Sequence, residues 1–128
     1  MALRSGYFEN WGGSPTVLLW GDAGGMLKLS EALRNVQRAP DLRTFCQSVD
    51  GKPITIKPSS QPVGMIHKDG ALEWSLDPAL ADDYAKLVDV LATSSKGHQY
   101  LESRNGVAVT VSIGEYPDSL HPDRPLQR

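Results

Sequence analysis

The chain contains two kinds of hydrophobic pattern. In several short segments apolar and polar residues alternate or apolar residues run together, whereas in two longer segments apolar residues recur every three or four positions. The first pattern is typical of strands and the second of amphipathic helices. We expect strands at 16–20, 43–49, 53–57, 63–67, 71–76, 97–104 and 107–113, and helices at 24–37 and 78–94.

This order of elements, β-α-β-β-β-β-α-β-β, predicts an α+β fold. Because most strands are joined by short connections, we expect an antiparallel or mixed sheet of about six to seven strands, with both helices packed on one face. Residues 7–11 precede this pattern as an aromatic-rich arm or short strand, and residues 1–116 form a single domain. Residues 117–128 are polar and contain three prolines, so we expect a mobile C-terminal tail.

Both helices have recognisable signals at their ends. Asp22 is placed to cap the first helix, and Pro40 ends it. At the second helix, Asp77 is the expected cap and Pro78 the first helical residue.

The dipeptide Asp69-Gly70 indicates a two-residue turn between two strands. With this turn, His67 lies at the exposed tip of the hairpin face that carries the apolar residues. These are Val63, Met65, Leu72, Trp74 and Leu76.

The dipeptide Asn105-Gly106 predicts a second tight turn, ahead of a run of alternating valines. If the loop has two residues, His98, Tyr100 and Glu102 lie on the valine face, and the Asn-Gly pair favours this register. If the loop has three residues and a bulge, the register slips by one residue and His98 turns outward.

The last hairpin therefore offers a candidate binding pocket, for which no catalytic residue is assigned. Half-buried His and Tyr side chains are explained more simply by polar tips that find partners at the edge of a core. The candidate pocket residues are His98, Tyr100, Glu102, Glu115 and Tyr116.

Composition narrows the range of partners. The 128 residues carry a net charge of −2 without a basic patch, so we do not expect nucleic-acid binding.

A single cysteine, Cys46, excludes an internal disulfide and fits a reducing compartment. The first residues lack the apolar region of a signal peptide, and no apolar run reaches membrane-spanning length. We therefore expect a cytoplasmic protein that does not contact membranes.

No motif with catalytic or metal-binding spacing is present. The glycine-rich segment 21–25 lacks the Lys-Ser/Thr pair of a phosphate-binding loop, and a tight turn explains it better. His67, His98 and His121 do not have the spacing of metal ligands, and Cys46 has no nucleophile signature around it. We expect no metal and no cofactor.

The tryptophans differ in their surroundings. Trp74 has the pattern of a core residue, whereas Trp11 and Trp20 lie near glycine-rich turns and are expected to be partly exposed. Exposed aromatic residues beside an acidic group such as Asp22 suit a protein interface. Alternatively, the two tryptophans seal the ends of the core.

Two parts of the chain resemble a group of small bacterial α+β proteins. They are Trp20-Gly-Asp-Ala-Gly-Gly-Met-Leu-Lys-Leu29 with Leu33, and Gly97-His-Gln-Tyr-Leu-Glu102 with Val111-Ser-Ile-Gly-Glu-Tyr116. Some proteins of this group are proposed immunity proteins of polymorphic toxin systems. The resemblance implies a cytoplasmic protein that binds another protein and catalyses nothing.

The sequence thus leaves two hypotheses of different classes. The first is a small non-catalytic bacterial protein that acts through contact with a protein partner, immunity-like or accessory, or through self-association at a strand edge. The alternative is an enzyme or small-ligand binder, with a pocket between the helices and the last hairpin that uses His98, Tyr100 and a nearby carboxylate.

Overall fold

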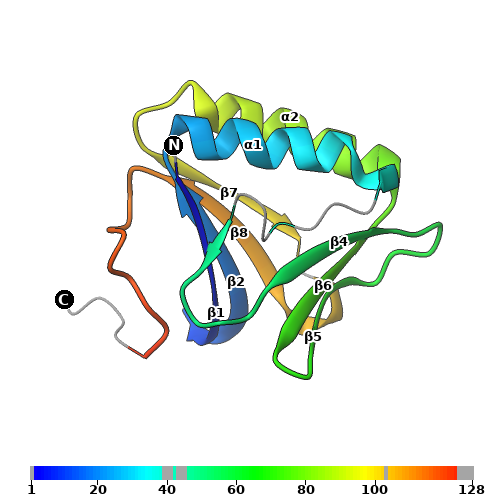
Figure 1. Cartoon of the computed structure of the whole chain (residues 1–128), viewed down its shortest axis with the longest axis horizontal. Helices are drawn as coiled ribbons and strands as arrows, with labels where there is room; N and C mark the ends of the chain where they lie inside the picture. The colour runs from blue at the N-terminus through cyan, green and yellow to red at the C-terminus, as the bar shows by residue number, and fades with distance from the viewer. Residues whose placement is uncertain (1, 39–41, 43–45, 103, 124–128) are drawn as a thin grey trace.

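The computed structural model describes residues 2–38, 42, 46–102 and 104–123, which form two helices and eight strands (Figure 1). Two short 3-10 turns, η1 and η3, complete the described elements. In chain order the elements are β1 (Leu3–Trp11), β2 (Ser14–Gly21), α1 (Ala23–Arg34), η1 (Val36–Arg38), β3 (Gln47–Ser48), β4 (Ile54–Pro58), β5 (Gly64–Lys68), β6 (Ala71–Leu76), α2 (Pro78–Ala92), β7 (Gly97–Glu102), η3 (Arg104–Gly106) and β8 (Ala108–Ile113).

The strands form two mixed sheets rather than the one expected sheet of six to seven strands. The larger sheet has the order β3-β1-β2-β8-β7, in which β3 and β1 run parallel, as do β2 and β8. The smaller sheet has the order β4-β6-β5, with β4 parallel and β5 antiparallel to β6. The predicted α+β class is therefore confirmed, whereas the division into two sheets was not predicted.

The first strand is longer than the expected arm. β1 pairs antiparallel with β2 over most of its length, and Trp11 pairs with Ser14 across a two-residue turn. Gly12 and Gly13 form this turn with φ values of 61° and 95°, a region that glycine enters without steric cost. The hairpin therefore follows from the Gly-Gly pair.

Both helices cover the same face of the larger sheet, as expected (Figure 1). Val17 and Leu19 of β2 lie in one core cluster with the buried residues of α1 and α2. Leu18 and Trp20, which alternate with them, point to the opposite face and lie in a second, smaller cluster. Every second residue of β2 thus faces a different core, which explains its continuous apolar run.

The predicted helix starts are confirmed. The Asp22 side chain accepts a hydrogen bond from the Gly25 N–H (2.8 Å), and the Asp77 side chain accepts one from the Ala79 N–H (2.7 Å). The ends differ by a few residues, since α1 stops at Arg34 instead of 37 and α2 at Ala92 instead of 94. Pro40, the expected terminator of the first helix, lies outside the described residues.

The hairpin at Asp69-Gly70 has the predicted register, with His67 opposite Leu72 and Met65 opposite Trp74. Both turn residues have positive φ. The prediction is wrong for Val63, which is 47% exposed. Gly64 has a φ of +84°, so the strand begins there and Val63 does not continue its apolar face.

Two predicted segments lie only partly within the described residues. Of the strand expected at 43–49, residues 43–45 lie outside, and Gln47–Ser48 form β3. Of the expected mobile tail, residues 124–128 lie outside, and the described part has one buried side chain, that of Leu120. Leu120 is buried in the second core cluster, because this cluster lies on the sheet face that the helices leave uncovered.

Candidate functional site

The last hairpin has the predicted turn but not the favoured register. Asn105 and Gly106 both have positive φ, and the Val107 N–H donates to the Arg104 carbonyl across them. The ladder then shifts between Tyr100 and Glu102, which leaves an extra residue, a β-bulge, in β7.

This bulge divides the predicted pocket residues between two faces of the sheet. His98 pairs with Ser112 and Tyr100 with Thr110, on the face opposite the helices, so the register that placed them on the valine face is wrong. Glu102 pairs with Val109, as expected, and lies on the helix side. The sequence contains no signal for the bulge, because a tight turn fixes the register only as far as the ladder is regular.

On the outer face, His98 and Glu115 form a hydrogen-bonded pair. The His98 Nδ1 lies 3.0 Å from Glu115 Oε1, and the Ser112 hydroxyl donates to the same oxygen at 2.7 Å. Partial burial raises the pKa of the Glu115 carboxyl, but the hydrogen bonds from Ser112 and His98 and the charges of His98 and Lys96 outweigh it, so the pKa lies below its usual range. A carboxylate on Nδ1 orients the ring, as in acid–base sites.

The surroundings of His98 are open rather than concave. Its side chain is 42% exposed and packs edge-on against the ring of Tyr100, which is 72% exposed. The valine face of β8 is closed by α2, where Val88, Val109 and Val111 are completely buried. His98 therefore has a carboxylate partner and a largely accessible ring.

Glu102 has a structural environment on the helix side. It is buried, accepts a hydrogen bond from the Tyr84 hydroxyl (3.0 Å) and lies 3.4 Å from the Arg104 guanidinium. Burial and the Glu102 charge raise the pKa of Tyr84. A small cavity of about 300 Å³ lies beside this cluster, and Tyr100 also lines it. These contacts connect α2 to the end of β7.

Trp20 and Asp22, two of the predicted interface residues, both have contacts that stabilise the fold. Trp20 is 2% exposed, contrary to expectation, and its indole N–H donates to the Pro117 carbonyl (3.1 Å). Asp22 caps α1 and also accepts hydrogen bonds from the Ala2 N–H through both oxygens (3.0 Å each). The backbone hydrogen bonds from Ala2 and Gly25 lower the pKa of Asp22 to about 2. A cavity of about 440 Å³ lies beside these residues.

Cys46 is buried, and burial raises the pKa of its thiol to about 11. It is therefore protonated at neutral pH, unlike a reactive thiolate. Within the described part of the chain, no group of three or more His, Cys, Asp or Glu side chains could hold a metal ion.

Trp11 is the predicted interface residue that remains partly exposed. Its ring packs edge-on against two other rings on the outer face of the larger sheet. Its ring centroid lies 4.8 Å from that of Phe8 and 5.3 Å from that of Tyr116. Tyr116 thus belongs to this aromatic cluster and not to a pocket with His98. The cluster lies next to a hollow between described residues.

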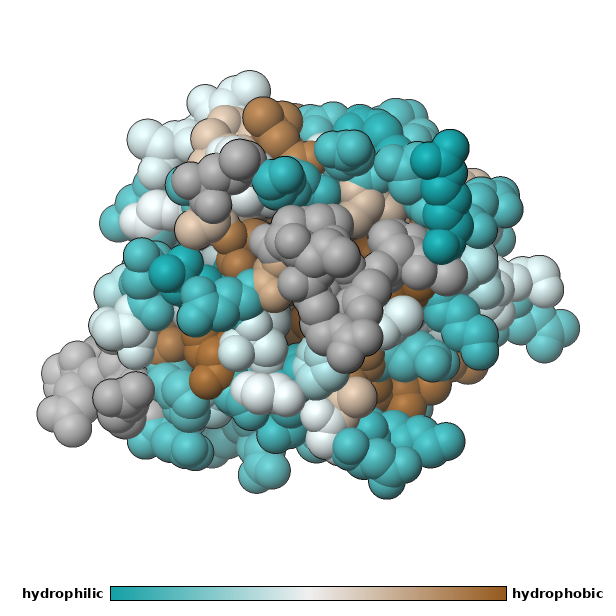
Figure 2. Space-filling model, viewed as in Figure 1, coloured by the Kyte–Doolittle hydropathy of each residue, from teal (hydrophilic) through white to brown (hydrophobic). Residues whose placement is uncertain are grey.

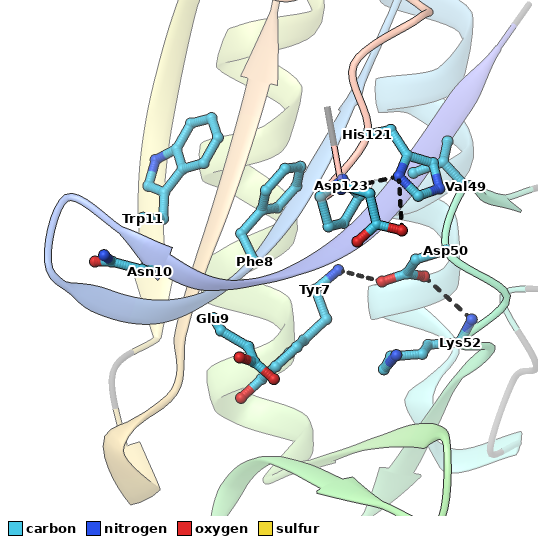
Figure 3. Close-up of a pocket in the computed structure, with 11 residues that line it drawn as sticks. Tyr7, Phe8, Glu9, Asn10, Trp11, Val49, Asp50, Lys52, His121 and Asp123 are labelled. Carbon is cyan, nitrogen blue, oxygen red and sulfur yellow. Dashed lines mark hydrogen bonds and ion pairs between the residues drawn. The ribbon is translucent and has the colours of Figure 1, made fainter. Parts of the chain in front are cut away.

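That hollow is a groove of about 820 Å³ along the edge of β1, which we call the β1 groove (Figure 3). It is lined by residues 7–11 of β1, by Val49, Asp50 and Lys52 after β3, and by residues 121–123. In Figure 3 the rings of Phe8 and Trp11 point to one side of the strand, whereas Tyr7 and Glu9 point to the other. The groove could not be predicted from the expectation that residues 7–11 form an arm or short strand, although the Gly12-Gly13 pair signals an edge hairpin.

The second sheet approaches the groove through an aromatic contact. The ring of Tyr7 on β1 stacks on that of His67 on β5, with centroids 4.4 Å apart. His67 is exposed, as expected for the tip of its hairpin. This contact holds the Tyr7 side of the β1 groove against the smaller sheet.

Comparisons with known proteins add no family to this description. No family model, no curated protein and no solved structure matches the chain.

Hydrophilic residues cover most of the face shown in Figure 2, with hydrophobic areas between them. None of the helices in the described ranges is long and apolar enough to cross a membrane.

Proposed function

We propose that this chain is a small, non-catalytic bacterial protein of the cytoplasm that acts by binding another protein through the β1 groove. The observation that carries the proposal is the groove itself, an 820 Å³ hollow along a strand edge that is largely unpaired among the described residues (Figure 3). Strand edges and partly exposed aromatic residues are common elements of protein interfaces.

The chemistry of the groove favours binding over catalysis. Its apolar wall includes Phe8 and Trp11, of which Trp11 is still partly exposed and can be buried further by a partner. Tryptophan and tyrosine supply a large contact area at a low cost in side-chain entropy, which is why they dominate the energetics of many interfaces.

An immunity-like role is the form of this function that the sequence resemblance favours. A protein of this kind protects the cell by binding a toxin, and it needs a stable docking surface rather than reactive groups. The test is to express in bacteria, one at a time, the proteins encoded by the genes that flank this one, with and without the chain, and we expect one of them to be toxic. Wild type should restore growth, and the two proteins should elute as one complex in size-exclusion chromatography with light scattering.

Glu9→Trp tests whether the groove is the docking surface. Glu9 is exposed and lines the groove, so a bulky side chain fills the space without disturbing the core. Glu73→Trp is the matched control, because Glu73 is an exposed strand glutamate on β6, outside the groove. Protection that Glu9→Trp leaves intact, or the absence of any complex, would overturn the proposal.

The pair of His98 and Glu115 favours a second candidate function, a small-ligand or acid–base site on the outer face of the larger sheet. A mixture of small polar compounds, observed by NMR in the presence of the protein, tests it. Compounds that bind wild type and are lost with His98→Gln would support this function, and identical spectra for the two proteins would exclude it.

A further inference from the structure

The free part of the β1 edge begins where β3 ends. β3 pairs only with Arg4 and Ser5, and the Val49 N–H donates the last main-chain hydrogen bond of this pairing, to the Ser5 carbonyl (2.9 Å). The Asp50 carboxylate then accepts from the Tyr7 N–H (2.7 Å), in the place where a neighbouring strand would offer a carbonyl. Beyond Tyr7, no described strand lies along this edge of β1.

The remaining edge is too short and irregular for a long main-chain ladder. The register of β1 against β2 shifts between Phe8 and Trp11, and the turn at Gly12 follows directly. Bulges of this kind bend a strand and obstruct the addition of a further strand. A partner in the β1 groove must therefore be recognised mainly by its side chains.

Carboxylates predominate among the charged groups of the groove. Glu9, Asp50 and Asp123 line it together with one lysine, Lys52. Asp50 is hydrogen-bonded by neutral donors, including the Ser48 hydroxyl (2.9 Å), and no described cation forms an ion pair with it or with Glu9. Asp123 lies 3.9 Å from the ring of His121, which forms an ion pair with it only when protonated. Glu9 and Asp50 still exceed the one lysine of the groove in charge, so its described residues have an excess of negative charge.

The charged groups lie beside an apolar surface. Phe8, Trp11 and Val49 belong to the second core cluster or pack against it, and all three line the groove. In Figure 3, Asp50 and Lys52 lie beyond Tyr7, away from Trp11. A matching ligand thus needs cationic groups and apolar groups side by side.

From this arrangement we infer that the β1 groove binds an extended segment of the partner protein in which lysine or arginine residues are interspersed with apolar ones. The inference rests on the proposed function and adds the chemistry of the partner. Cationic side chains reach Glu9 and the Asp50 region, and apolar side chains cover Trp11. A second copy of this chain is a poor occupant, because two acidic grooves brought together repel each other.

Selection from a phage-displayed library of random linear peptides against the full chain tests this inference. The enriched peptides should carry an excess of lysine and arginine with apolar residues between them. When such a peptide is added to the isotope-labelled protein, the amide resonances of Glu9, Trp11 and Lys52 should shift. Its affinity should fall as the salt concentration rises, because exposed charge pairs are screened.

Glu9→Gln isolates the contribution of charge, since the two side chains have nearly the same shape. An exposed ion pair contributes at most about 1 kcal/mol, so the Kd of the selected peptide should rise roughly two- to fivefold. Glu73→Gln removes the same charge outside the groove and should leave the Kd unchanged. Selected peptides without a cationic excess, shifts confined to other residues, an unchanged Kd with Glu9→Gln, or a failure to enrich any peptide would each overturn the inference.

A failure of this inference can be distinguished from a failure of the proposed function. If Glu9→Trp abolishes the complex with the protein partner while Glu9→Gln leaves its affinity and salt dependence unchanged, the groove binds a protein that is not recognised by charge. The inference then fails and the proposed function stands. If no complex forms, or if Glu9→Trp leaves it intact, the proposed function itself fails.

Discussion

Replacing Asp22 with alanine should destabilise the fold by about 2 kcal/mol. Its side chain caps α1 through the Gly25 N–H and also binds the Ala2 N–H, so it joins the start of β1 to the start of the helix. Loss of an aspartate N-cap costs about 1 kcal/mol, and loss of a further hydrogen bond costs about the same. Asp22→Asn retains an oxygen acceptor that caps helices equally well and loses only the charge, so it should cost about 1 kcal/mol.

The charge of Asp22 adds a dependence on pH. Its pKa falls from 3.8 to about 2 on folding, so the ionised carboxylate stabilises the native state above pH 3.8. This stabilisation is lost as the pH falls through about 2, where the folded protein also takes up the proton. The shift corresponds to about 2.5 kcal/mol before screening, and because the side chain is exposed we expect about 1 kcal/mol.

Urea denaturation of wild type, Asp22→Ala and Asp22→Asn, followed by circular dichroism between neutral pH and pH about 2, measures both effects. The difference between wild type and Asp22→Asn should shrink by about 1 kcal/mol as the solution becomes acidic. If wild type and Asp22→Asn lose the same free energy of unfolding between neutral pH and pH about 2, the role assigned to the charge is refuted. An Asp22→Ala variant as stable as wild type at neutral pH would refute the role assigned to the cap.

Three further substitutions test the packing described above, each by its free energy of unfolding in urea. Tyr84→Phe should cost about 1–2 kcal/mol, because it removes the hydrogen bond to the buried Glu102 carboxylate. Leu120→Ala should cost about 2–3 kcal/mol, because this side chain is 2% exposed. Gly25→Ala, which in most helices is stabilising, should destabilise by more than about 1 kcal/mol, because a Cβ there would lie 2.0 Å from the Ala2 carbonyl oxygen.

Each of these substitutions has a matched control. Tyr100→Phe removes a hydroxyl from a residue that is 72% exposed, and Leu87→Ala truncates a leucine that is 38% exposed on α2. Gly97→Ala places its Cβ at an ordinary contact distance of 3.4 Å from Leu91. All three controls should stay within about 0.5 kcal/mol of wild type. If a control lowers the free energy of unfolding as much as the substitution it is matched with, the contact assigned to the substituted residue is contradicted.

Local features of this fold could be predicted where the chemistry of a few neighbouring residues determines them. The caps Asp22 and Asp77 and the turns at Asp69 and Asn105 have the geometry that their residue types favour. Each depends on hydrogen bonds or φ values within a few positions, so periodicity and turn chemistry suffice to predict it.

Features that depend on distant contacts could not be predicted in this way. The bulge near Leu101 moved His98 and Tyr100 to the outer face, although the turn beside it was predicted correctly. The division into two sheets and the burial of Leu120 depend on which segments meet in space, and a single sequence does not show this. The β1 groove was missed for the same reason, because it combines residues 7–11 with two segments far along the chain.

The parallel pairing of β2 with β8 has a consequence for how the protein is made. β2 leaves the ribosome before β8, its neighbour at the centre of the larger sheet, because most of the other described elements lie between the two strands in the sequence. Until β8 has been made, the Val17 and Leu18 faces of β2 have neither β8 beside them nor the segment containing Leu120 over them. The nascent chain must therefore expose apolar surface of β2 during this interval, and we expect it to depend on chaperone contact until β8 has emerged.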